Sequence, residues 1–154
     1  MTIWYRASPS SNKKNVFSGT GGEFTPGRWH KLGSKVVYCS ESIALCTLEW
    51  LANQGLSVSQ FSYYRYSIEI PDSSIIKFDP EQLPKNWRAT PATELTRDFA
   101  ESNLFTNKNI LAIAVPSVII PEEYNLVINP LHSSFVKVSK SIKNLGEYKA
   151  PLRK

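Results

Sequence analysis

Short apolar runs of strand length, separated by turn residues, restrict the fold of this chain most strongly. The clearest run extends from Ile110 to Val115 and ends at Pro116. A continuous run of this length is typical of a strand that is buried inside a sheet. Similar runs predict further strands over residues 3–7, 36–39, 61–70, 75–78, 125–128 and 135–138. Many short strands with few helices indicate an α+β fold around a mixed or antiparallel sheet.

Only two segments have the length and pattern of substantial helices. The first covers residues 41–54, with Ser40 as the expected N-cap and Gly55 as the residue that ends it. The second covers residues 91–102, with Thr90 or Thr93 as the expected N-cap. Residues 8–27 are rich in Ser, Gly, Asn and Lys and predict a long loop, whereas residues 140–154 show no clear pattern.

Composition indicates a weakly basic globular protein. The 154 residues suit one domain over residues 1–154, and a net charge of +5 favours anionic partners. The N-terminus lacks the apolar segment of a signal peptide, and no run approaches the roughly 18 apolar residues of a membrane span, so we expect a cytoplasmic protein. Cys39 and Cys46 lack the CxxC spacing of a zinc or redox site. Their spacing alone leaves a disulfide open, but Cys39 ends a predicted strand and Cys46 lies inside the following helix, which favours two buried thiols.

Glu49 interrupts an otherwise apolar helix. Between Ile43 and Ala52 only Thr47 and Glu49 are polar, which is typical of a helix buried on nearly all sides. Two interpretations are open for this carboxylate. It belongs to a narrow polar strip that faces water together with Ser42 and Asn53, or it lines a cleft.

Three further side chains are candidates for ligand binding. Arg28 follows a glycine-rich loop, and arginine binds phosphate in a bidentate fork. The loop has neither the dinucleotide-binding nor the P-loop pattern. Tyr38 lies in a predicted strand, where a core position is the common alternative. Ser117 follows the strand that ends at Pro116, and without a GxSxG elbow a binding role is favoured over nucleophilic catalysis.

The remaining polar and aromatic residues support weaker interpretations. His30 and His132 are too few and too isolated to indicate a metal site, and His132 fits a turn. Aromatic residues surround a basic one at Phe61, Tyr63, Tyr64, Arg65 and Tyr66, which is one feature of nucleic-acid binding platforms. Strand alternation would divide them between two faces, so direct nucleic-acid binding is disfavoured.

Together these segments resemble the RES domain family, the toxin half of Res–Xre toxin–antitoxin pairs. The matching segments follow the family order: YRA at 5–7, GRW at 27–29, VVYCS at 36–40, ALCTLE at 44–49, LPKNWR at 83–88, AVPSVIIPEEYNLVINP at 114–130, and His132. The resemblance implies an ADP-ribosyltransferase-like fold and NAD as substrate, with no separate cofactor. It places the family's active-site residues on Arg28, Tyr38, Glu49 and Ser117, and a further pocket arginine on Arg6. His30 stands where the family often has Asn, so we expect different hydrogen bonding in this loop.

The resemblance implies a toxin that cleaves the nicotinamide–ribose bond, as an NAD glycohydrolase or phosphorylase, and an antitoxin with an Xre-like helix-turn-helix region that neutralises it. Nicotinamide leaves from a cationic pyridinium, so one carboxylate suffices where a glycosidase needs two. We expect Glu49 to stabilise the ribosyl cation or activate water or inorganic phosphate. The other expected contacts are Arg28 and Arg6 on the pyrophosphate, Tyr38 on the nicotinamide end and Ser117 on ribose or phosphate. Transfer of ADP-ribose to a host protein and a non-enzymatic nucleic-acid-binding module are the alternatives.

Overall fold

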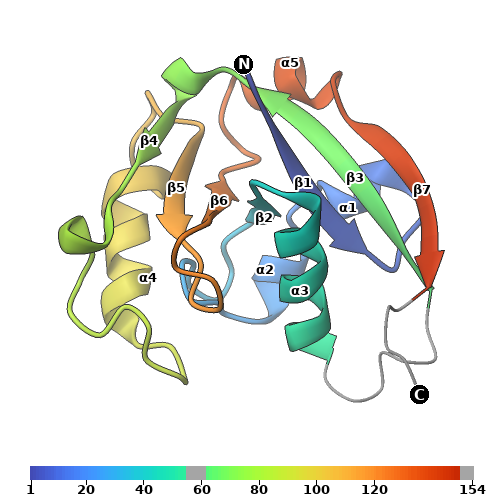
Figure 1. Cartoon of the computed structure of the whole chain (residues 1–154). Coiled ribbons are helices and arrows are strands. Elements are labelled where there is room, and N and C mark those ends of the chain that lie inside the picture. The colour runs from blue at the N-terminus through green and yellow to red at the C-terminus, as the bar shows by residue number, and fades with distance from the viewer. Residues whose placement is uncertain (55–61, 150–154) are drawn as a thin grey trace, which may run out of the picture.

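The computed structural model describes residues 1–54 and 62–149, which contain a seven-stranded sheet (Figure 1). The strands are β1 (Thr2–Ser8), β2 (Val37–Ser40), β3 (Ser62–Ile70), β4 (Ile75–Lys77), β5 (Ala112–Pro116), β6 (Tyr124–Ile128) and β7 (Lys143–Lys149). Their order in the sheet is β4-β5-β6-β2-β1-β3-β7. Only the β4–β5 pair is parallel, so the predicted α+β class with a mixed sheet is confirmed.

Five α-helices connect these strands within the described residues: α1 (Lys13–Val16), α2 (Gly21–Phe24), α3 (Ile43–Gln54), α4 (Glu94–Ala100) and α5 (Phe135–Ser139). The last turn of α4 continues as a π-helical segment, Glu101–Phe105, and two single 3-10 turns cover Asp72–Ser74 and Pro80–Gln82. No helix in the described part of the chain combines the length and apolar character needed to cross a bilayer.

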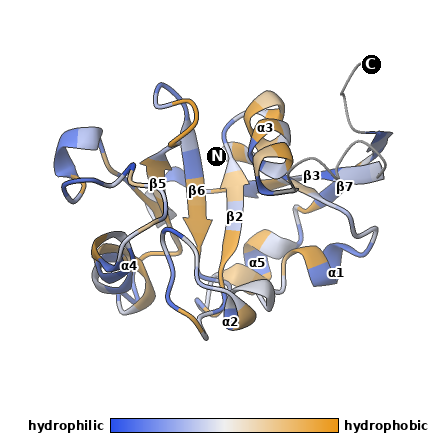
Figure 2. Cartoon of the chain, turned by 90° about the horizontal axis from the view of Figure 1, so that it is seen from below, coloured by the Kyte–Doolittle hydropathy of each residue, from blue (hydrophilic) through white to orange (hydrophobic). Residues whose placement is uncertain are grey.

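Hydrophobic side chains pack on both faces of the sheet. Because side chains alternate along a strand, neighbouring residues of β2 enter different cores. Val37 and Cys39 pack with residues of α1 and α5, whereas Tyr38 packs with residues of α4 and its π-helical extension. Figure 2 shows the hydrophobic character of α3, β2 and β6 along the middle of the molecule. Ser40, two residues from Tyr38 on the same face of β2, is connected through Asn125 to Glu49 of α3. Tyr38 and Glu49 therefore lie on the same side of the sheet.

Most predicted strands are confirmed to within a residue or two, as β1, β2, β4, β5 and β6. β5 is fully buried and paired on both sides, as its continuous apolar run indicated. β3 is also present, although Phe61 lies outside the described residues. Both Cys39 and Cys46 are buried free thiols, which confirms that expectation.

The prediction of a last strand over residues 135–138 is wrong, because these residues form α5. Phe135 and Val138, one helical turn apart, both pack into the core, while Val136 is 70% exposed. A strand would instead have placed Phe135 and Val138 on opposite faces. The run is rich in β-branched residues, but tertiary packing overrides this local preference.

The unpatterned segment after residue 140 contains β7, an edge strand that the sequence did not indicate. Its side chains are largely exposed, so no apolar alternation marks it. The strand depends on backbone pairing with β3, interrupted by a bulge at Arg65 and Tyr66. The Arg65 guanidinium also lies 3.3 Å from the centre of the Tyr148 ring, which fixes the two strands side by side.

The predicted helix boundaries need two corrections. Ser40 is not the N-cap of α3: the helix begins at Ile43, and the hydroxyl of Ser42 accepts the Leu45 amide at 3.0 Å. Gly55, the expected end of this helix, lies outside the described residues. The second helix begins at Glu94 with Thr93 before it, and the long loop over residues 8–27 contains the short helices α1 and α2.

Candidate active site

Glu49 lies at the centre of a hydrogen-bonded network on the α3 side of the sheet. Its Oε1 atom accepts hydrogen bonds from Ser117 Oγ at 2.7 Å and from Asn125 Nδ2 at 2.8 Å. Ser40 Oγ in turn donates to Asn125 Oδ1 at 2.6 Å. We call these four residues the carboxylate cluster. They come from α3, β2, β6 and the end of β5, and they place the carboxylate against the sheet instead of on a strip that faces only water.

Ser117 is fully buried and uses all of its hydrogen-bonding capacity inside the protein. Its hydroxyl donates to Glu49, and it accepts the amides of Ile119 and Ile120, each at 3.1 Å. A hydroxyl has one proton and two lone pairs, so all three are occupied. The expected direct contact of Ser117 with ribose or phosphate would have to replace one of these bonds. In this structure the serine holds Glu49.

The second oxygen of Glu49 differs from the first. Within residues 1–54 and 62–149, no group donates a hydrogen bond to Oε2, and Glu49 remains partly exposed. A carboxylate with one oxygen fixed by two donors has a defined orientation. Its other oxygen keeps its lone pairs for a ligand.

The hydroxyl of Tyr38 belongs to a second network, which we call the phenol cluster: Tyr38, His30, the Trp29 amide and the Thr25 carbonyl. His30 Nε2 lies 2.7 Å from the Thr25 carbonyl oxygen, which can only accept, so Nε2 carries the proton. In the neutral ring Nδ1 then accepts the Tyr38 hydroxyl at 2.7 Å. The Trp29 amide donates to the same hydroxyl at 3.3 Å.

Burial keeps the two side chains of the phenol cluster neutral. Desolvation lowers the pKa of His30 below its ordinary value of 6.5, although its bond to the Thr25 carbonyl opposes this. Desolvation also raises the pKa of the Tyr38 phenol far above its ordinary value, against the nearby arginines. Tyr38 therefore remains a protonated phenol at neutral pH and cannot serve as a base.

The loop that carries Arg28 has little freedom. A Cβ atom at Gly27 would lie 2.6 Å from the His30 ring and 3.0 Å from the Tyr38 hydroxyl, so only glycine fits. From α4, Thr96 Oγ1 donates to the Arg28 carbonyl at 2.6 Å and Arg97 Nε donates to the Gly27 carbonyl at 2.8 Å. These contacts fix the backbone on both sides of the arginine.

Arg28 and Arg6 both donate to main-chain carbonyls. Arg28 Nη1 binds the carbonyls of Trp87 and Ala89, at 2.8 and 2.7 Å. Arg6 binds the carbonyls of Val16 and Tyr38, at 3.0 and 2.9 Å. Within the described ranges neither arginine forms an ion pair. Burial lowers the pKa of both, and the field of Glu49 partly offsets this at Arg28.

A hollow of about 260 Å³ opens beside the phenol cluster. Its lining includes Arg6, Tyr38 and His30 together with the segment from Gly19 to Gly22. Arg28, Glu49 and Ser117 do not line it. Apart from Arg28, the structure therefore places the predicted residues in two adjoining groups, one at this hollow and one around Glu49. Arg28 is hydrogen-bonded to neither group, and the fields of both Glu49 and Tyr38 act on it.

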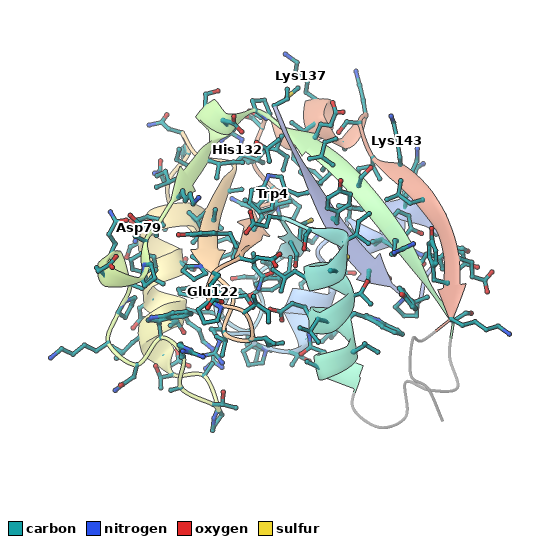
Figure 3. The ribbon with its side chains drawn as sticks, in the orientation of Figure 1. Trp4, Asp79, Glu122, His132, Lys137 and Lys143 are labelled. Atoms are coloured by element: carbon teal, nitrogen blue, oxygen red, sulfur yellow. The ribbon has the colours of Figure 1, made fainter. Side chains whose placement is uncertain are left out.

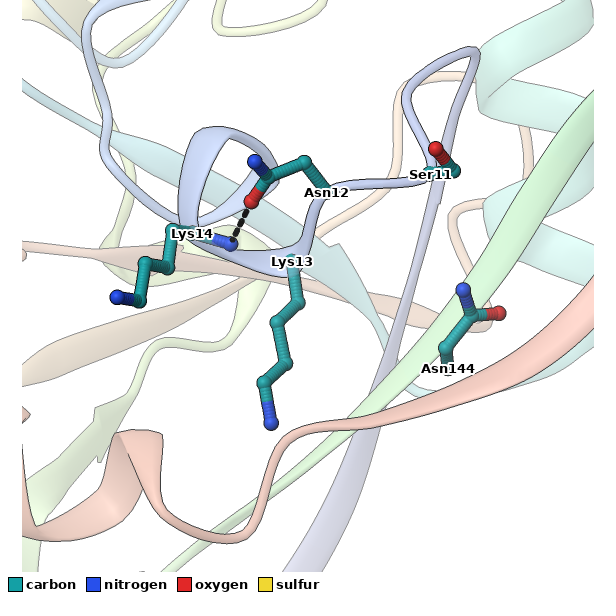
Figure 4. A pocket seen from close by; sticks show the side chains of 5 residues that line it. All are labelled: Ser11, Asn12, Lys13, Lys14 and Asn144. Atoms are coloured by element: carbon teal, nitrogen blue, oxygen red, sulfur yellow. Dashed lines mark hydrogen bonds between the residues drawn. The ribbon is translucent and has the colours of Figure 1, made fainter.

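A larger hollow, of about 620 Å³, contains none of the predicted residues (Figure 4). It lies between α1 and β7 and is lined by Ser11, Asn12, Lys13, Lys14 and Asn144. Its lysines and amides are exposed, and Asn12 is occupied in accepting the Lys14 amide at 3.0 Å. This open surface has no buried polar group that would hold a ligand.

His132 has a structural role, as its position in a turn suggested. Its Nε2 donates to the Lys108 carbonyl at 2.6 Å, and its Nδ1 accepts the Ser134 amide at 3.0 Å. Figure 3 shows His132 towards the upper end of the sheet, whereas Glu122 marks the β5–β6 loop at the lower end, near α3. No cluster of three or more potential metal ligands occurs among the described residues.

Sequence reasoning missed Asn125 and Ser40. Asn125 begins an apolar run, and the only available signal was one polar residue at the start of a strand. The two side chains meet because the register pairs Ser40 of β2 with Asn125 of β6. That pairing joins residues 85 positions apart, which no local pattern could indicate.

Comparisons with known proteins give a consistent result. The family model described as "RES domain" matches residues 3–149. The protein "Toxin Res" of Photorhabdus laumondii is 33% identical over 143 residues, covering 93% of this chain and 91% of that protein. The "Prs ADP-ribosylating toxin" of Sphingobium sp. is 36% identical over 118 residues, 75% of this chain and 73% of that protein. A chain of the M. tuberculosis MbcT–MbcA toxin–antitoxin complex shares the fold, with a TM-score of 0.68 and 16% identity over 96% of this chain and 83% of that chain.

Proposed function

Because the chain belongs to the RES domain family, we propose that it is the toxin of a toxin–antitoxin pair and acts by breaking down NAD. The bond cleaved is the one between nicotinamide and ribose, with water or inorganic phosphate as acceptor, so the activity is that of an NAD glycohydrolase or phosphorylase. The observation that carries this proposal is the oriented carboxylate of Glu49, with one oxygen held by two donors and no donor to the other oxygen among the described residues.

Glu49 supplies the reactive charge in this proposal. Departure of nicotinamide takes the bonding electrons to the pyridinium nitrogen and leaves a ribosyl cation. A fixed carboxylate oxygen stabilises that cation electrostatically without reorganising. It also accepts the proton that water or phosphate loses when its oxygen bonds to the ribose carbon. Both roles need an oriented carboxylate with one open oxygen, and the donors to Oε1 of Glu49 leave Oε2 open among the described residues.

Arg28 and Arg6 bind the anionic part of the substrate. Each is anchored through carbonyls, which fix the guanidinium plane without neutralising its charge. An anchored cation without a carboxylate partner suits a pyrophosphate group. Tyr38 presents its ring beside Arg6 and contacts the nicotinamide–ribose end. Because its phenol stays protonated, it takes no proton in the reaction.

An antitoxin is the partner of this toxin, and we propose that it carries an Xre-like helix-turn-helix region. The fold shared with a chain of a toxin–antitoxin complex supports such a partner. The net charge of +5 favours an acidic segment on the antitoxin, which would speed association and set its orientation.

Transfer of ADP-ribose to a protein is the second candidate function. It is favoured by one observation, the name of the Sphingobium relative, an ADP-ribosylating toxin. The two functions share the cleavage step and differ only in the acceptor. NAD that is labelled in its ADP-ribose part separates the two functions. Transfer leaves the label on protein, whereas breakdown leaves it on free ADP-ribose or on ADP-ribose phosphate.

The test is NAD consumption by purified Glu49→Gln. We expect the rate to fall by about 10²–10⁴-fold, the usual range for loss of a positioned proton-transfer group. Glu122→Gln, which loses the same charge from an exposed loop, is the matched control and should keep wild-type activity (Figure 3). Mass spectrometry of the products with and without phosphate identifies the acceptor. Equal NAD consumption by wild type and Glu49→Gln would refute the proposal.

A further inference from the structure

We propose that Asn125, held by Ser40, is a positioning residue that fixes the plane of the Glu49 carboxylate and therefore the direction of its open oxygen towards the substrate. This inference rests on the proposed function of Glu49 and concerns two residues that neither the sequence motifs nor the family resemblance assign a role in the site. Asn125 does not reach the reacting atoms in this proposal. It acts through its bond to Glu49 Oε1 at 2.8 Å.

The direction of the Asn125 amide is determined by its two partners. A carboxylate oxygen can only accept, so the atom that faces Glu49 Oε1 must be the amide nitrogen. The amide oxygen then faces Ser40, whose hydroxyl donates to it at 2.6 Å. A flipped amide would point its oxygen at a carboxylate oxygen, placing two acceptors in contact. Glu49 therefore selects the orientation in which Asn125 is a donor, and Ser40 holds the amide there by donating to its oxygen.

The sheet gives this pair a rigid base. Ser40 and Asn125 are directly opposite residues on the neighbouring strands β2 and β6, where side chains on one face stand side by side. Ser40 is only 3% exposed, and Leu126 next to Asn125 is fully buried. A catalytic carboxylate supported from strands is held more accurately than one supported from a loop.

The two donors to Oε1 have different origins. Ser117 is set by the turn after β5, through the amides of Ile119 and Ile120. Asn125 is set by the sheet, through Ser40. Two donors on the same oxygen from two directions fix the rotation of the carboxylate. With only one of them, the plane of the carboxylate could rotate, and the open oxygen would no longer keep one direction.

The first experiment compares Asn125→Asp with wild type. The substitution keeps the shape but removes the N–H donor and places a second negative charge against Glu49. We expect kcat to fall about 10²-fold, in the range seen when a second-shell partner is lost, while KM changes by less than about threefold. Asn144→Asp makes the same change on exposed β7, where the side chain only accepts the Gly146 amide, and should leave kcat unchanged.

Two further variants separate positioning from a general structural role. Ser40→Ala removes only the group that orients the amide, so we expect a smaller fall in kcat, about tenfold, on the same scale as other second-shell losses. In a Glu49→Gln background, Asn125→Asp should cause no additional loss, because residues that act through one group are not additive. An unchanged kcat in Asn125→Asp, or a further loss in the Glu49→Gln background, would overturn the proposal.

Crystal structures of Asn125→Asp and Ser40→Ala test the positioning without using activity. We expect the Glu49 carboxylate to rotate or to occupy two orientations in both variants. Wild-type placement of Glu49 in both would also overturn the proposal. If the carboxylate moves but the wild-type protein does not consume NAD, the positioning role stands and the proposed function is the part that fails.

Discussion

The carboxylate cluster and the phenol cluster lie on the same side of the sheet and treat their central side chains in opposite ways. In the carboxylate cluster two donors hold one oxygen of Glu49 and leave the other without a partner among the described residues. In the phenol cluster the Tyr38 hydroxyl donates to His30 and accepts from the Trp29 amide. The first arrangement leaves a carboxylate oxygen free to bind a ligand, whereas in the second the protein itself binds the neutral hydroxyl.

This difference suggests that the carboxylate cluster takes part in the reaction and that the phenol cluster maintains the structure around it. An available charged oxygen can change its interactions as a transition state forms, and only such interactions accelerate a reaction. A hydroxyl that is already fully engaged contributes mainly to the position of its ring and of the Arg28 loop. Substitutions in the carboxylate cluster should therefore reduce kcat, and those in the phenol cluster should mainly reduce stability.

Replacement of Ser117 by alanine should have the largest effect on stability, and it should also lower kcat. Glu49 loses one donor, and the buried amides of Ile119 and Ile120 lose their acceptor. We expect a loss of about 2–4 kcal/mol in the free energy of unfolding, and a fall of about 10–10²-fold in kcat. Urea unfolding and NAD turnover measure the two. Ser139→Ala, which removes one hydroxyl bond on α5, is the control for loss of a single contact.

Tyr38→Phe should affect stability more than turnover. The change leaves His30 Nδ1 without a donor and the Trp29 amide without an acceptor, at a cost of about 1–3 kcal/mol. The ring and its contacts stay in place, and no proton transfer is lost, so kcat should remain within about tenfold of wild type, far less than a lost acid–base group costs. A fall in kcat as large as that of Glu49→Gln would show that the phenol takes part in the chemistry.

Gly27→Ala breaks the phenol cluster by crowding. The new methyl group would lie 2.6 Å from the His30 ring, so the ring or the loop must shift. Overpacking of this kind costs about 1–3 kcal/mol. The control is Gly21→Ala in α2, where a Cβ meets nothing within 4 Å and the change should be neutral or stabilising. Thermal unfolding of the two variants measures the difference, and equal melting temperatures would contradict the close fit at Gly27.

Periodicity revealed the parts of the fold that are buried through their own side chains. The run at Ile110–Val115 and the apolar helix around Glu49 were both recognised because most of their consecutive residues are apolar, as expected for buried elements. β7 was missed because an exposed edge strand depends on its partner β3. α5 was mistaken for a strand because a five-residue helix with Val and Phe has no distinctive local pattern.

The same limit applies to the site. Glu49 could be singled out because a carboxylate in an apolar helix is unusual, and Arg28 because of its glycine-rich loop. The family resemblance added Arg6, Tyr38 and Ser117. Asn125 could not be found, because its role depends on the register between β2 and β6. The bond between Tyr38 and His30 was also not predictable from the sequence, because it joins a loop residue to a strand residue.

The pH dependence of stability should carry the smallest effect, and it distinguishes the two clusters by the group that titrates. Protonation of His30 turns Nδ1 from an acceptor into a donor, so it can no longer accept the Tyr38 hydroxyl. The pKa of His30 is lowered in the folded protein by burial, so the unfolded chain binds the proton more readily. Stability from the neutral ring is therefore complete above the unfolded pKa of about 6.5 and declines as the pH falls through the lowered folded value.

His30→Asn removes this titration and can keep an acceptor for the Tyr38 hydroxyl. We expect the difference in unfolding free energy between wild type and His30→Asn to narrow as the pH falls from about 7 to 5, by at most about 1.4 kcal/mol for each unit of pKa shift. Urea unfolding across this range measures it, with His132→Asn as the control for loss of an imidazole from a turn. A difference that stays constant with pH would mean that the Tyr38–His30 bond does not depend on a neutral ring. The assignment of Tyr38 and His30 as a hydrogen-bonded pair of neutral side chains would then be wrong.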